Sequence, residues 1–207
     1  MASSTTTEVE VANEALLYVG VSQTVNDFDE STAEAKACKA FFAKTRDALL
    51  EKFWWKFATS RSFLALLSSE ERSNWAYTYA LPANCIAPRY IDPGVRNPRE
   101  DQRIPFDLEA LLSGAGVVNG LCLVTDQPDA ELVYTARVEN VALWSPGFVT
   151  AMAWHLAVQL ALVLPIKPEL ATRALAMAKV ELGEAKVMQL RGHQPDLPAP
   201  SEYTTAR

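Results

Sequence analysis

The sequence predicts a mainly α-helical protein with a small antiparallel β region, an α+β chain built as a helical bundle with an inserted β subdomain. Apolar residues recur at helical spacing before residue 58 and after residue 139. Between these stretches, short runs rich in β-branched and aromatic residues alternate with prolines and glycines. We therefore expect a helical bundle from residues 1–58 and 139–192, a β-rich insert at 59–138 and an extended C-terminal tail at 193–207.

Two helices are predicted in the N-terminal stretch. The first covers about residues 7–18, where apolar residues share one helical face and Gly20 follows as a C-terminal stop signal. The second begins at Ser31-Thr32-Ala33-Glu34, which has the hydroxyl and glutamate spacing of a capping box. Apolar residues continue at helical spacing to Phe57, so we expect this helix to include the aromatic segment Phe53–Phe57.

The central stretch is predicted to form several short antiparallel strands, whose register the sequence does not reveal. Turn-forming residues separate the candidate runs, which are Arg61–Leu67, Trp75–Leu81, Ile86–Ile91, Leu121–Thr125 and Leu132–Val138. The charged segment Val95–Asp107 is expected to be an exposed loop.

Two further helices are predicted after residue 140. Ser145-Pro146 marks a helix start, and Phe148–Leu164 follows with no internal glycine or proline. This run is short for a membrane span and carries His155 and Gln159, so we expect a central buried helix. The last helix should run from about Lys167 to Leu190, with a core stripe of mostly small residues: Ala171, Leu175, Ala178, Leu182 and Ala185.

Composition restricts the classes of function. The chain has 207 residues, a net charge of −6 and 49% apolar residues, which is typical of one folded, acidic, soluble domain. The acidic balance argues against a protein that mainly binds phosphates. Three widely spaced cysteines and the absence of a signal sequence at Met1–Thr7 favour synthesis in a reducing cytoplasm.

No motif of known chemistry occurs in the sequence. Phosphate-binding glycine loops and a GxSxG elbow are both absent. The two histidines are His155, in the middle of a predicted helix, and His193, in the tail. The acidic cluster Asp27, Asp29 and Glu30 is explained by a solvated loop. We therefore predict no catalytic residue, no cofactor and no metal site.

Two features suggest contacts with other proteins. Aromatic residues crowd Phe53–Phe57, so Trp54 and Trp55 are candidate subunit contacts, with burial on two sides of the protomer's own core as the alternative. The tail combines extended-chain prolines with an aromatic and a charged residue near its end, with a disordered terminus as the alternative. Its candidate contact residues are Pro195, Pro198, Pro200, Tyr203 and Arg207.

Several segments, taken in order, resemble the head-to-tail adaptor (connector) proteins of tailed bacteriophages, which include the tail accessory factors and tail tubular proteins of short-tailed phages. The similar segments are Asn13–Gly20, Asp29–Ala37, Arg46–Leu50, Trp54–Ala58, Trp75–Cys85 and Phe148–Leu162. The resemblance lies in the order and spacing of these segments, which together cover about residues 10–190.

The resemblance implies a structural virion protein rather than an enzyme. Such adaptors are made in the host cytoplasm and form a ring, usually of twelve copies, beneath the portal protein at the head-tail joint. The ring extends the DNA channel, helps to retain the packaged genome until ejection, and supports the downstream tail or nozzle protein. It contacts passing double-stranded DNA without sequence preference and needs no cofactor or membrane.

Within this interpretation, Arg96, Arg99 and Arg103 are candidates for a loop that faces the channel or a partner. Two alternatives remain open at this point. One is a peptidoglycan hydrolase carried in the tail, and the other is a tail-completion protein at a different joint.

Overall fold

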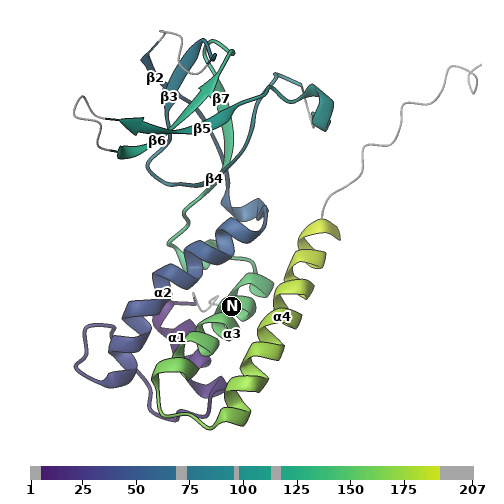
Figure 1. The fold of residues 1–207 in the computed structure, drawn as a ribbon. Helices are drawn as coiled ribbons and strands as arrows, with labels where there is room; N and C mark the ends of the chain where they lie inside the picture. The colour runs from purple at the N-terminus through teal and green to yellow at the C-terminus, as the bar shows by residue number, and fades with distance from the viewer. Residues whose placement is uncertain (1–5, 69–73, 96–97, 113–117, 192–207) are drawn as a thin grey trace, which may run out of the picture.

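The computed structural model describes residues 6–68, 74–95, 98–112 and 118–191. Its helices are α1 (Glu8–Tyr18), α2 (Ala33–Lys52), α3 (Pro146–Val163) and α4 (Pro168–Arg191). Its strands are β1 (Thr59–Phe63), β2 (Ala65–Ser68), β3 (Tyr77–Ala80), β4 (Cys85–Ile91), β5 (Asp107–Leu112), β6 (Val118–Thr125) and β7 (Glu131–Ala136). Figure 1 shows the strands gathered at one end and the helices at the other.

The prediction of a helical bundle with a small β region is wrong. The described residues form four α-helices and seven strands in two antiparallel sheets, 48% helical and 22% strand, which is an α+β fold. The helices do not clearly form a bundle either. Helices α1, α2 and α4 all pack against α3, while α1 and α2 make few contacts with each other. This arrangement follows from the sequence of α3, which is apolar on almost every face and so has to be covered from several sides.

The strands form two sheets, with the orders β1-β7-β4 and β2-β3-β6-β5. Leu64, between β1 and β2, is buried and donates its backbone N–H to the carbonyl of Ala130 where the chain passes from one sheet to the other. The sheets share a hydrophobic cluster separate from the helical core, which includes Tyr79, Leu123 and Leu132. The β part therefore has a core of its own, which the sequence analysis did not anticipate.

Helix α1 begins and ends where the sequence predicts. Thr7 is the N-cap, and it forms a capping box with Glu10. At the C-terminal end, the backbone N–H groups of Gly20 and Val21 donate to the carbonyls of Leu17 and Leu16, as in a Schellman motif. Gly20 has a φ of +80°, a conformation that side chains with a Cβ rarely adopt.

Replacing Gly20 by alanine is expected to lower the free energy of unfolding by about 1–2 kcal/mol, because alanine is strained at positive φ. A Cβ at this position would also lie 2.9 Å from Leu170 Cδ1. Gly94 is the matched control, since its φ is +75° and a Cβ there would meet nothing within 4 Å. Urea unfolding should show a larger loss for Gly20→Ala than for Gly94→Ala. Equal losses would show that Leu170 moves aside freely.

Helix α2 is shorter than predicted. It is capped by Thr32 rather than Ser31, and it ends at Lys52 instead of continuing to Phe57. Phe53 and Trp55 have extended backbone conformations, and a 3₁₀ turn covers Lys56–Ala58. In an extended backbone successive side chains point to opposite sides, so the two neighbouring tryptophans enter different environments.

Helices α3 and α4 lie close to their predicted positions. Ser145 is the N-cap of α3 and Pro146 occupies its first turn, although the Ser145 side chain makes no capping hydrogen bond. Helix α4 buries Ala174, Ala178 and Ala185, so only part of the predicted stripe is buried and Leu175 is exposed. Within the described ranges, one helix, α3, is long and apolar enough to span a membrane by length and composition alone. A core helix packed against neighbours, as α3 is, has the same composition.

Candidate functional site

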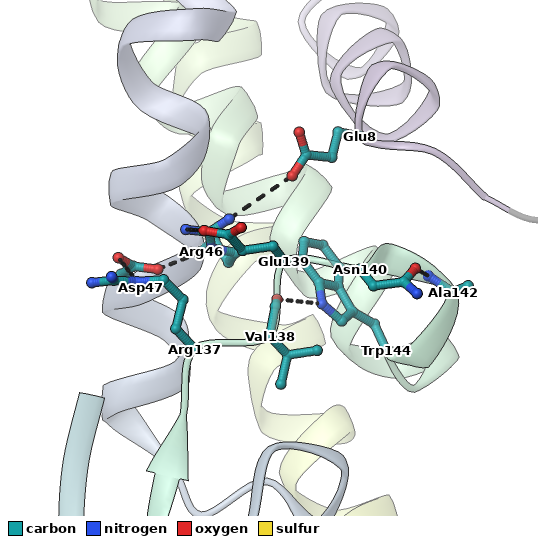
Figure 2. Close-up of polar contacts among 9 residues, drawn as sticks. All are labelled: Glu8, Arg46, Asp47, Arg137, Val138, Glu139, Asn140, Ala142 and Trp144. Atoms are coloured by element: carbon teal, nitrogen blue, oxygen red, sulfur yellow. Dashed lines mark hydrogen bonds and ion pairs between the residues drawn. The ribbon is translucent and has the colours of Figure 1, made fainter. Parts of the chain in front are cut away.

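The helical and β parts are joined by a cluster of ionic contacts around Arg46 of α2 (Figure 2). The Arg46 side chain is almost fully buried, and its guanidinium lies 2.9 Å from Asp47, 3.8 Å from Glu8 and 3.7 Å from Glu139. Arg137, just after β7, pairs with Asp47 at 3.0 Å. These contacts connect α1 and α2 to the segment that leads from β7 into α3. We assign this cluster a structural role, since its carboxylates are all engaged with arginines.

A second contact between the two parts comes from Arg89 on β4. Its Nε donates to Thr135 Oγ1 at 2.8 Å, and its Nη2 donates to the carbonyls of Glu51 and Phe53 at 3.3 and 3.0 Å. These carbonyls belong to the end of α2, which lacks further helical N–H donors. Arg89 therefore fixes the end of α2 against the sheet β1-β7-β4.

A groove lies at this junction, and it is larger than the cleft between α2 and α3. It has a volume of about 520 Å³ and is lined chiefly by Trp54, Lys56, Arg61, Tyr90, Val133 and Leu190. We call it the junction groove. The C-terminal end of α4 forms one wall, where the Gln189 side chain accepts a hydrogen bond from the backbone N–H of Lys56 at 3.2 Å.

The junction groove has aromatic walls and cationic edges. The Trp54 and Tyr90 rings lie 5.7 Å apart at 64°, and Trp54 Nε1 donates to Thr59 Oγ1 at 2.8 Å, which holds the indole in place. Arg103 lies over the Tyr90 ring at 5.4 Å, and Arg61 pairs with Asp92 at 2.5 Å. No aspartate or glutamate is among the described residues that line the groove.

The two neighbouring tryptophans, Trp54 and Trp55, differ in burial. Trp54 is 37% exposed and forms part of the junction groove, so it remains a candidate contact. Trp55 is fully buried, donates Nε1 to the carbonyl of Leu49 and packs against the rings of Phe53, Phe57 and Phe148. It belongs to the core of the protomer and offers no surface to a partner, which is the alternative that the sequence analysis left open.

The outer face of α4 carries an exposed apolar seam. Val180 and Val187 are about half exposed, Leu190 is exposed, and a Cβ on Gly183 would meet nothing within 4 Å. The seam residues are spaced alternately by four and three, as in helices that pack against another helix: Ala176, Val180, Gly183, Val187 and Leu190. We call this surface the α4 seam. The face of α4 that packs on α3 is a different one, centred on Ala178 and Ala185.

A smaller cleft of about 250 Å³ lies between α2 and α3, beside His155, Lys44, Lys52 and Gln159. His155 Nδ1 lies 2.9 Å from the carbonyl oxygen of Ala151, one turn back along α3. Burial lowers the pKa of His155, and the nearby Lys52 and Lys186 lower it further. No aspartate or glutamate is among the residues of the described ranges that line this cleft.

The lowered pKa of His155 predicts that acid weakens the fold. The unfolded chain binds a proton near pH 6.5 while folded His155 still resists it, so stability should fall as pH drops below about 6.5. His155→Gln should remove this part of the pH dependence and leave the stability above pH 7 nearly unchanged. Urea unfolding of both proteins between pH 4.5 and 8 measures the difference. Parallel profiles for the two proteins would contradict the prediction.

The titratable groups with shifted pKa values do not converge on one place. Burial raises the pKa of the Cys38 thiol to about 11, so this thiol is a poor nucleophile. Burial also raises the pKa of Glu8, within the Arg46 cluster. No group of three or more His, Cys, Asp and Glu side chains that could hold a metal ion occurs in the described part of the chain.

The remaining candidate residues are spread over the molecule. Arg99 and Arg103 are exposed, in a segment with a 3₁₀ turn at Glu100–Gln102 and a bridge from Ile104 to Ile91. Outside the described residues lie Arg96 and the tail candidates Pro195, Pro198, Pro200, Tyr203 and Arg207.

Sequence reasoning missed the Arg46 cluster, the Arg89 contacts and the α4 seam. A signal for the first was present: Arg46 lies four residues after Phe42 and three before Leu49, on the face that has to be buried.

The sequence matches no model of a known protein family, and no similar sequence is found among curated proteins.

Proposed function

We propose that this chain is a structural virion protein, a head-to-tail adaptor that forms a ring beneath a phage portal, extends the DNA channel and carries the next tail component. The proposal rests on the sequence resemblance described above together with one structural observation, the α4 seam. An adaptor has to bind copies of itself along a defined surface, and the α4 seam is an unpartnered surface of this kind.

The α4 seam is suited to a head-to-tail contact. An apolar helix face with a small residue at its centre lets a second helix approach closely, and Gly183 has open space in front of it. A ring closes when each copy presents this face to a different surface of its neighbour with a fixed rotation. The helical part has a hydrophobic core of its own within one protomer, which supports folding before assembly.

Charge and site chemistry also favour a conduit over an enzyme. A net charge of −6 reduces adhesion of DNA phosphates to a channel through which the genome must pass. A hydrolase that cleaves glycosidic bonds needs two carboxylates that face one cleft, and among the described residues neither the junction groove nor the cleft beside His155 is lined by a carboxylate. No observation favours placing the protein at a different joint of the tail.

Electron microscopy of the chain co-purified with the portal protein of the same genome tests the proposal. We expect a ring of this chain on one end of the portal, with twelve copies if it follows the portal symmetry, and α4 at the contact between copies. A protein that does not bind the portal, or that labels elsewhere on the virion, would overturn the adaptor assignment. Cleavage of purified cell wall by the isolated chain would establish the hydrolase alternative instead.

A further inference from the structure

We propose that the junction groove binds the C-terminal segment Pro195–Tyr203 of the same chain as an extended, proline-rich ligand. This segment has the sequence PDLPAPSEY, with prolines at 195, 198 and 200. The first two have the PxxP spacing that places proline rings on one face of a polyproline II helix. The inference concerns the free protomer, so it does not depend on ring formation.

The walls of the groove match this ligand in chemistry. Polyproline segments bind in grooves lined by aromatic side chains, because proline rings pack against flat aromatic faces and lose little entropy on binding. Trp54 and Tyr90 supply two such faces set at an angle, and Val133 supplies an aliphatic surface beside them. The hydrogen bond from Trp54 to Thr59 fixes the indole before a ligand arrives.

The charges of the segment and of the groove are complementary, which also supports this ligand. Between Pro195 and Tyr203 the segment carries two acids, Asp196 and Glu202, and no base. The groove is lined by Lys56 and Arg61, and Arg103 and Lys186 flank it over the rings of Tyr90 and Phe53. Asp92 offsets part of this charge through its pair with Arg61, and the balance around the groove remains positive. An acidic, proline-rich segment therefore fits the groove better than a neutral or basic one.

The short connection between α4 and Pro195 favours the protomer's own C-terminal segment as the ligand of the groove. Helix α4 ends at Arg191, and the residue before it, Leu190, already lines the groove. Pro195 follows four residues later, within about 14 Å of Arg191 even in the most extended backbone. A ligand attached by so short a connection has an effective concentration in the millimolar range, so weak contacts suffice to hold it.

The test compares NMR spectra of the full chain with those of a chain that ends at Arg191. The indole N–H signal of Trp54, one of five tryptophans, and the amide signals of Lys56 and Val133 report on the groove. We expect these signals to differ between the two proteins and to be independent of concentration in the full chain. A synthetic peptide covering residues 194–204 should move the signals of the shortened chain toward those of the full chain.

Variants of the segment provide controls that leave the folded core untouched. A peptide with alanine at 195, 198 and 200 should bind at least about 10-fold more weakly, since it loses the preformed extended conformation. Asp196→Lys and Glu202→Lys in the full chain should return the groove signals toward those of the shortened chain. Identical groove signals in the full and shortened chains would overturn the proposal. Groove signals of the full chain that change on dilution would also overturn it, and would assign the groove to the segment of a neighbouring copy.

Discussion

Replacing Trp55 by alanine is expected to lower the free energy of unfolding by about 3–5 kcal/mol, because a large buried aromatic side chain is lost and a cavity remains. The side chain is fully buried at the point where α2 ends and its ring packs edge-on against Phe148 of α3. The substitution also leaves the carbonyl of Leu49 without the indole N–H that it accepts. Urea unfolding followed by circular dichroism measures the change.

Trp54→Ala is the matched control, since it removes the same side chain from the neighbouring residue. Trp54 is partly exposed and contacts Tyr90 and Thr59 at the edge of the groove. We expect a loss of about 1 kcal/mol, the size typical of a partly exposed aromatic contact. A Trp55→Ala loss no larger than that of Trp54→Ala would show that the two residues do not differ in packing as described.

The double substitution Val180→Glu, Val187→Glu is expected to abolish ring formation on the portal at micromolar concentration while the protomer stays folded. Both side chains are about half exposed in the protomer, so their replacement removes little core contact. In a helix–helix contact each glutamate would be an unpaired buried charge, which costs several kcal/mol. Sedimentation and electron microscopy with the portal protein measure assembly, and thermal unfolding checks the fold.

Met188→Glu is the control for this experiment. Met188 is 65% exposed and follows Val187 directly, but it lies about 100° further around the helix, away from the α4 seam. It adds the same charge to the same helix and should leave assembly unchanged. Normal rings from the double variant would remove the α4 seam from the contact between copies. Loss of assembly by Met188→Glu as well would show a general effect of charge.

The helices were predictable because their signals are local. The capping residue Thr7, the stop at Gly20 and the proline at 146 each act within one turn of the chain, so the sequence around them suffices to place the helix end. The end of α2 was not predictable in this way. The aromatic residues after Lys52 continue the helical spacing, but in the fold Phe53 is extended and its carbonyl accepts a hydrogen bond from Arg89, a residue 36 positions later in the chain.

Predicting the β part and the junction groove requires knowledge of contacts between residues that lie far apart in the sequence. Strand β5 has the sequence DLEALL, whose leucines at 108, 111 and 112 also fit the spacing of a helix, and its pairing with β6 decides its conformation. The groove forms from the end of α2, three strands and the end of α4, which lie far apart in the sequence. The aromatic residues at 53–57 did indicate an unusual surface, but only the fold separates exposed Trp54 from buried Trp55.

The pairing of β1 with β7 brings together the two points at which the chain leaves and re-enters the helical part. Thr59, where the chain leaves the helical part, lies opposite Thr135, just before it returns, so the exit and entry points are about 5 Å apart. A gap of this size can be closed by a short turn or by another folded unit whose ends are adjacent, with little displacement of α2 relative to α3. We therefore expect related chains to differ more in the size of the β part than in the length of the helices, provided that they keep the contacts of Arg89 and Arg137 with α2.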